Sequence, residues 1–312
     1  MGKQTDWSKL QTLYKGFREG VEIIREGQNS AALYILVSGR LNVFKKGVKV
    51  LQIQKRGDYI GEISILLNIP SSASVKAETA TTLIEIESSK VLTFLRHSPD
   101  IAISLANKMA ERLAQLNSNF AELIDRSYRP DLIQSLKNKY DKQPPAPISD
   151  DPLDLGKLKS LYVEVPENTE IIEQGKYPNN LYILVKGTVE ILKNQKMIAV
   201  ENKSGYYIGD VSILRNTSAN ASVKTRTKCT FIRIPITKVD YFLNHSPDIA
   251  ISISKKLAER IITLNDLFLD IQSFEVEELQ KAKKGNSGID FDGVLNLDKE
   301  IYDLLGIDPN NL

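Results

Sequence analysis

The sequence predicts an α+β protein made of two tandem antiparallel β-rolls, each flanked by an N-terminal helix and two C-terminal helices, the last of them long. Two observations predict this class. The chain repeats itself at a constant offset, and within each copy short apolar runs separated by glycines precede a stretch with helical spacing. Many short strands at close spacing are typical of a compact, jelly-roll-like antiparallel roll.

The internal repeat is the feature that organises the whole chain. The segment 33–39 (LYILVSG) recurs as 181–187 (LYILVKG), and 97–104 recurs unchanged as 245–252. Both pairs lie 148 positions apart (181 − 33 and 245 − 97), so there is no net insertion or deletion between the copies. The predicted organisation is domain 1 (1–136), a proline-rich linker (137–152), domain 2 (153–284) and a C-terminal tail (285–312).

The changing periodicity of the first copy predicts its elements in order. Helical spacing at Leu10, Leu13 and Tyr14 predicts a helix over 7–17. The period then becomes two, which predicts strands at Val21–Ile24, Leu33–Val37, Leu41–Phe44, Val48–Ile53, Ser74–Ala77 and Thr82–Ile86. A short helix is expected over 88–95. The triplet Ser98-Pro99-Asp100 is typical of a helix start, and this last helix is expected to reach at least Leu123.

Composition excludes several functional classes. Lys and Arg total 41 against 39 Asp and Glu, so the charge balance gives no reason to expect a nucleic-acid partner. The longest apolar run, 31–37, is too short to span a membrane. A single cysteine, Cys229, excludes an internal disulfide framework and fits a reducing compartment, so the expected location is cytoplasmic. The chain shows no P-loop, metal-ligand cluster or nucleophile motif, so we expect neither catalysis nor a metal cofactor.

One stretch in each copy carries candidate binding chemistry. We call residues 60–75 (IGEISILLNIPSSASV) the first cassette and residues 208–223 (IGDVSILRNTSANASV) the second cassette. Each has a glycine and a carboxylate at the mouth of a short helical turn. Free backbone N–H groups beside one acceptor suit a phosphate joined to a hydroxylated sugar. We therefore expect a small anionic ligand at this place.

A helix, a glycine-punctuated roll, a Gly-Glu turn and two helices in succession resemble the cyclic nucleotide-binding domain, here in tandem. This family includes the bacterial catabolite activator protein and the regulatory subunits of cAMP-dependent protein kinase. The resemblance rests on Gly27, Leu33-Tyr34-Ile35, Gly39, Gly57, Gly61-Glu62 and Pro99, with their partners 148 residues later. It implies that the glutamate accepts the ribose 2′-hydroxyl, while an arginine pairs with the cyclic phosphate and backbone N–H groups line the pocket.

Both cassettes depart from the family pattern at the phosphate. Ser71 stands where the family has its arginine, and Ser218-Ala219 replaces the Pro-Arg pair in the second cassette, which also shortens the acid to Asp210. A hydrogen bond to a charged group contributes about 1.5–3 kcal/mol, so this loss costs roughly one to two decades in affinity. The phosphate-binding sites are therefore interpreted as degenerate.

The predicted ligand-binding residues follow from this alignment of the cassettes. Those of domain 1 are Gly61, Glu62, Ile63, Ser64, Ser71, Ser72 and Ala73. A weaker site in domain 2 would use Gly209, Asp210, Val211, Ser212, Ala219 and Asn220. The retained Gly61-Glu62 favours a non-catalytic regulatory protein that senses a cyclic nucleotide or related anion and signals to a protein partner. The missing arginines favour the alternative, a ligand-free scaffold for dimerisation and assembly.

The last helix of each copy carries an apolar stripe with alternating spacings of four and three residues. Such a heptad-like seam is what two helices need in order to pair. The predicted pairing residues are Met109, Leu113, Leu116, Phe120 and Leu123 in domain 1, and Leu257, Ile261, Leu264, Phe268 and Ile271 in domain 2. The pairing joins either two chains as a homodimer or the two copies of one chain as a pseudo-dimer. His97 and His245 each stand alone before a helix and are interpreted as capping or surface residues.

Overall fold

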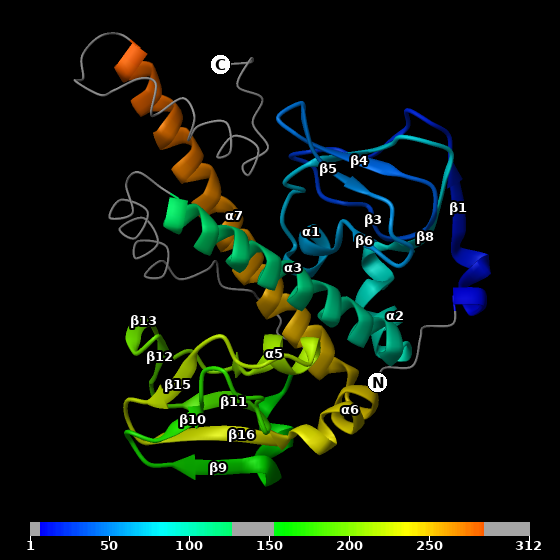
Figure 1. Cartoon of the computed structure of the whole chain (residues 1–312). Coiled ribbons are helices and arrows are strands. Elements are labelled where there is room, and N and C mark those ends of the chain that lie inside the picture. Colours follow the sequence, from blue (N-terminus) through cyan, green and yellow to red (C-terminus); the bar gives the residue numbers. More distant parts are fainter. Residues whose placement is uncertain (1–6, 127–152, 284–312) are drawn as a thin grey trace. The chain divides into compact units, whose positions relative to one another are not determined.

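The computed structural model describes residues 7–126 and 153–283 (Figure 1). The chain divides into two compact units, residues 1–111 with 148–258 and residues 112–147 with 259–312. The first unit contains both β-rolls, and the second contains the distal turns of the two long helices. The predicted linker 137–152 and tail 285–312 lie outside the described residues, so the domain boundaries remain predictions.

The elements of the first copy follow the predicted order. They are η1 (Trp7–Leu13), β1 (Tyr14–Phe17), β2 (Glu22–Ile24), β3 (Ala32–Ser38), β4 (Leu41–Lys45), β5 (Val48–Ile53), β6 (Tyr59–Ile60), α1 (Glu62–Leu67), β7 (Ser74–Ala77), β8 (Thr81–Glu87), η2 (Ser88–Lys90), α2 (Val91–His97) and α3 (Pro99–Arg126).

The second copy repeats this order, as expected from the constant offset. Its elements are η3 (Leu155–Leu161), β9 (Tyr162–Val165), β10 (Glu170–Ile172), β11 (Asn180–Lys186), β12 (Val189–Lys193), β13 (Lys196–Glu201), β14 (Tyr206–Ile208), α5 (Asp210–Arg215), β15 (Ser222–Thr225), β16 (Cys229–Pro235), α6 (Ile236–His245) and α7 (Pro247–Lys283).

Each roll is built from two four-stranded antiparallel sheets. In the first roll the strand orders are β1-β8-β3-β6 and β2-β7-β4-β5. The second roll has the corresponding orders, β9-β16-β11-β14 and β10-β15-β12-β13. Every strand pairing is antiparallel, as in β3 with β8 and β11 with β16. The predicted fold class is therefore confirmed, including the two helices that follow each roll.

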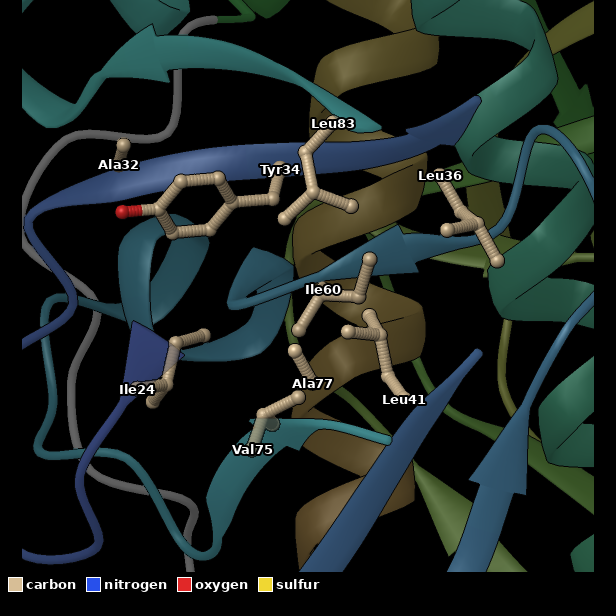
Figure 2. Packing of buried hydrophobic residues seen from close by; sticks show 9 residues of the cluster. All are labelled: Ile24, Ala32, Tyr34, Leu36, Leu41, Ile60, Val75, Ala77 and Leu83. Carbon is tan, nitrogen blue, oxygen red and sulfur yellow. The ribbon is translucent and has the colours of Figure 1, made fainter. Parts of the chain in front are cut away.

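The core of the first roll lies between its two sheets. Figure 2 shows Tyr34, Leu36, Leu41, Ile60 and Leu83 gathered there with residues of β2 and β7. Side chains alternate along a strand, so the neighbours of Tyr34 in β3, Leu33 and Ile35, lie on the opposite face of the same sheet. They are also buried. A sheet buried on both faces explains why β3 reads as a nearly continuous apolar run.

The structure differs from the sequence-based expectation at two places. The N-terminal helix is a 3-10 helix that ends at Leu13, and Tyr14 begins a strand, because Tyr14 pairs with Ile84 of β8. The two-residue strand β6 was not predicted, since it is too short to show a period. The strands that were predicted agree with the structure to within a residue at each end, and both long helices are present.

We predict that Leu41→Ala lowers the free energy of unfolding by about 2–5 kcal/mol, because it removes a fully buried side chain from the first roll. Urea denaturation measures the change. Leu51→Ala is the matched control, since Leu51 on the adjacent strand β5 is 53% exposed. Equal effects of the two substitutions would contradict the core described here.

Candidate ligand-binding site

Gly61 sets the geometry of the first cassette. Its φ of 79° is left-handed, and it immediately precedes α1. A Cβ atom built on Gly61 would lie 2.6 Å from Ser30 Oγ and 3.1 Å from the carbonyl oxygen of Ala32. Gly209 has the same conformation, with φ of 87°, before α5. The positive φ favours glycine at both positions, and at Gly61 the close approach to Ser30 excludes a Cβ as well.

The first cassette is closed by hydrogen bonds that centre on Ser64. The Ser30 N–H donates to Ser64 Oγ (3.2 Å), and the Ser64 hydroxyl donates to the carbonyl of Ile69. The Ile69 N–H returns a bond to the Ser64 carbonyl (3.0 Å). Ser64 was predicted to bind ligand, but its hydroxyl holds the turn together. Ser30, which the sequence analysis missed, supports it from the loop just before β3.

Ser71 occupies the place of the family's arginine and is held firmly by its backbone. The Gly27 N–H donates to the Ser71 carbonyl, and the Ser71 N–H donates to the Gln28 carbonyl, both at 2.8 Å. The side chain is 8% exposed, and its Oγ atom has no hydrogen-bond partner among the described residues. A buried hydroxyl in this condition is unusual in a folded protein.

The two cassette carboxylates are both buried. Glu62 and Asp210 are each 4% exposed, at the first position of α1 and α5. These acids are therefore part of the protein interior and not solvated surface groups. Burial of a carboxylate is unfavourable unless hydrogen bonds compensate it. The other predicted residues of the first cassette are Ile63 and Ala73, which are half-buried, and Ser72, which is exposed.

The second cassette has the same backbone frame but fewer buried polar residues. The Gly175 N–H donates to the Ala219 carbonyl (2.8 Å), and the Ala219 N–H donates to the Lys176 carbonyl (2.9 Å). Ala219 is buried and offers no side-chain hydrogen bond. Proline 178 stands where the first copy has Ser30. The Ser212 hydroxyl donates only a long bond, 3.4 Å, to the Ser218 carbonyl.

Two further residues predicted for domain 2, Val211 and Asn220, do not add polar groups to the interior of the second cassette. Val211 is half-buried and apolar, and Asn220 is exposed. That the site of domain 2 is the weaker one stays a prediction.

The strand that enters the first cassette is also tied to α3. The Tyr59 hydroxyl donates to the carbonyl of Ile101 (3.2 Å), and Lys108 Nζ lies 2.9 Å from Asp58 Oδ1. Burial raises the pKa of Tyr59 above its ordinary range. Desolvation lowers the pKa of Lys108, but the hydrogen bonds and charges of Asp58 and Glu111 together outweigh it and raise the pKa overall. In the second copy Tyr206 replaces Asp58.

The predicted pairing residues are only partly described. Met109, Leu113, Leu257 and Ile261 are buried, and Leu116 and Leu264 are half-buried. The side chains of Phe120, Leu123, Phe268 and Ile271 lie outside the described residues. Pairing between helices therefore stays a prediction.

The two histidines lie at the surface. Nδ1 of each exposed ring contacts a carbonyl of its own helix, Thr93 O for His97 (2.7 Å) and Tyr241 O for His245 (2.8 Å). The described part of the chain contains no cluster of three or more His, Cys, Asp or Glu side chains able to hold a metal ion. Within the same residues, no helix has the length and apolarity needed to span a membrane.

We predict that Gly61→Ala destabilises the protein more than Gly47→Ala does. Both glycines have positive φ, so alanine is strained at either position, but only at Gly61 does the new Cβ collide with neighbouring atoms. The strain alone costs about 1–2 kcal/mol. Thermal unfolding of the two variants measures the difference. Similar losses would show that the contact with Ser30 relaxes freely.

Comparisons with known proteins agree with this geometry. A family model for the cyclic nucleotide-binding domain matches residues 14–98 and 162–246. The cAMP-dependent protein kinase regulatory subunit of Schizosaccharomyces pombe is 24% identical over 224 residues, which cover 67% of this chain and 47% of that protein. A cGMP-dependent protein kinase of Eimeria tenella is 36% identical over 106 residues, which cover 32% of this chain and 10% of the kinase.

Among solved structures, the catabolite activator protein of Thermus thermophilus is 23% identical, with a TM-score of 0.34, and the match covers 43% of this chain and 62% of that one. This chain spans about half the length of the regulatory subunit it matches, and much less of the kinase. The two segments matched by the family model take up more than half of the 312 residues and contain the strands of the two β-rolls. The chain therefore belongs to the cyclic nucleotide-binding domain family.

Proposed function

We propose that this chain is a non-catalytic regulatory protein whose first β-roll binds a small ligand, a cyclic nucleotide or a related molecule. The observation that carries the proposal is the polar content of the first cassette. It holds a buried carboxylate, Glu62, and a buried hydroxyl, Ser71, that lacks a partner among the described residues. A fold that had only to assemble would gain nothing from an unsatisfied buried hydroxyl, since such a group costs about 1–3 kcal/mol.

The comparison between the copies supports the proposal that the first roll is the one that binds. The second cassette has the same backbone hydrogen bonds but replaces Ser71 by Ala219 and Ser30 by Pro178. Each replacement removes a hydroxyl group, and the proline also removes an N–H donor. The second roll thus keeps the backbone frame of the site but lacks both the Ser71 hydroxyl and the Ser30 groups that bond Ser64 and Ala32 in the first roll. We assign it a supporting role.

The proposed signal passes from the first cassette to α3. Asp58 and Tyr59 directly precede the cassette and contact Lys108 and Ile101 of α3. These α3 residues are seven positions apart and therefore lie on one side of the helix. A ligand that shifts β6 would act on α3 through both contacts. A protein partner that reads the position of α3 or α7 completes the proposal, by analogy with the regulatory subunits that this chain resembles.

The alternative is a scaffold that binds no ligand. Two observations favour it: neither cassette has the arginine of the family pattern, and Met109, Leu113, Leu257 and Ile261 of the predicted seams are buried. In that case the long helices serve dimerisation or assembly, and the rolls are their supports. The scaffold hypothesis explains why neither cassette has the family's arginine, but it does not explain the polar groups buried in the first cassette.

A thermal-shift titration of the full chain tests the proposal. The probes are cAMP, cGMP, adenosine, guanosine, ATP and inorganic phosphate. We expect at least one to raise the melting temperature in a saturable way, because a ligand bound only by the native state stabilises it. Glu62→Gln should raise the ligand concentration needed for the half-maximal shift at least tenfold, whereas the matched variant Asp210→Asn should leave that concentration unchanged. Absence of any shift up to millimolar concentration would support the scaffold.

We predict that Asp58→Asn loosens α3 without unfolding the first roll. The Asp58–Lys108 pair is partly exposed, so its loss should cost about 1 kcal/mol or less. Hydrogen exchange of peptides from residues 99–111 should become faster. Glu87→Gln is the control, since it removes the exposed pair with Lys90 and does not touch α3. Unchanged exchange in α3 would argue against the proposed route.

The same pair has a defined pH dependence. The pKa of Lys108 in the folded protein is above its ordinary value of 10.5. The stabilisation is therefore fully present below the unfolded pKa and disappears as the pH rises through the folded pKa. The difference in unfolding free energy between the wild-type chain and Asp58→Asn should persist at neutral pH and vanish under strongly alkaline conditions.

A further inference from the structure

We propose that the first cassette selects an uncharged, hydroxyl-bearing ligand of the nucleoside class over a cyclic nucleotide, and that Ser71 determines this choice. The inference rests on the proposed function, since it takes the first roll to be the binding roll. It replaces the anionic ligand that the family resemblance implies. Its basis is the hydrogen-bonding state of the cassette hydroxyls together with the balance of charges around them.

Ser71 carries the hydroxyl of the first cassette that is buried and has no hydrogen-bond partner among the described residues. Ser64 is used within the turn, and Ser74 Oγ accepts a hydrogen bond from the Glu26 N–H (2.9 Å). Ser72 is exposed. Only Ser71 combines burial, at 8% exposed, with an Oγ atom that has no partner among the described residues.

The backbone prevents Ser71 from finding a partner by moving. Its N–H and its carbonyl both bond to the loop at Gly27 and Gln28, at 2.8 Å each. A hydroxyl group both donates and accepts hydrogen bonds. A ligand hydroxyl or amide can donate a hydrogen bond to Ser71 Oγ or accept one from it. A phosphate oxygen can only accept, and it brings a charge that Ser71 cannot neutralise.

The charges around the cassette disfavour a phosphate. Residues 60–75 contain no Lys or Arg, while the carboxylate of Glu62 is 4% exposed. The arginine nearest along the chain to the Gly27 loop, Arg25, donates to Glu22 at 2.7 Å and is exposed. An anion entering the first cassette would therefore be buried where residues 60–75 supply no cation. Burial of an unpaired charge is strongly unfavourable, whereas a neutral polyol brings no charge into the cassette.

The second cassette provides a natural reference for this position. Ala219 occupies the place of Ser71 with the same two backbone hydrogen bonds. The frame therefore accepts a residue without a hydroxyl, and Ser71→Ala is expected to fold. The variant isolates the contribution of the hydroxyl from that of the backbone.

Isothermal titration of the full chain with adenosine, guanosine, cAMP and cGMP tests the inference. The wild-type chain should bind a nucleoside more tightly than the corresponding cyclic nucleotide. Ser71→Ala should weaken nucleoside binding about two- to tenfold, which is the loss of one neutral hydrogen bond. Ser71→Arg should raise the affinity for the cyclic nucleotide about ten- to a hundredfold and, because it also removes the hydroxyl, should not raise the affinity for the nucleoside. The exposed neighbour variant Ser72→Ala is the control.

The outcomes separate this inference from the proposed function. Tighter binding of a cyclic nucleotide than of its nucleoside by the wild-type chain would overturn the inference and support the proposed function. Failure of both nucleosides and both cyclic nucleotides to bind the wild-type chain and Ser71→Arg would overturn the two together. If Ser71→Arg proves misfolded by circular dichroism, the wild-type preference and Ser71→Ala still decide the question.

Discussion

The close approach of Gly61 to Ser30 is the constraint on which the candidate site depends. Because a Cβ at Gly61 would meet Ser30 Oγ at 2.6 Å, the chain can enter α1 only as glycine with positive φ. That entry places Glu62 in a buried position. It also brings Ser64 within hydrogen-bonding distance of the Ser30 N–H, which closes the turn. The site is thus a consequence of how tightly one turn packs on the start of β3.

The two rolls show how one frame carries different chemistry. The strand orders correspond throughout, and the backbone hydrogen bonds at Ser71 are repeated at Ala219. The apolar residues that alternate along the strands maintain that frame in both copies. Polar residues that add nothing to the core have diverged, as at Asp58, where the second copy has Tyr206. A duplicated roll can therefore keep its stability while one copy retains more binding and coupling groups than the other.

The sensor and the scaffold differ in what the buried polar groups are for. In a sensor, the hydroxyl of Ser71 awaits a ligand and the Lys108–Asp58 pair reports its arrival to α3. In a scaffold, the same hydroxyl is an uncompensated cost and the ion pair only fastens a helix. Native proteins rarely leave buried hydroxyls unsatisfied without a reason. This physical argument and the family resemblance together make the first roll the place to look for a ligand.

The sequence by itself determined the duplication, the strands of each roll from β2 onward that are longer than two residues, the long helices and the location of both cassettes, because repeats, period-two runs and helix-start residues are local signals. Only the tertiary structure decided that Tyr14 begins a strand, that Ser64 is consumed by the turn and that Ser71 is buried without a partner. It also revealed the pairing of Asp58 with Lys108, 50 residues away. These features depend on contacts between segments far apart in the chain, which leave no trace in local periodicity.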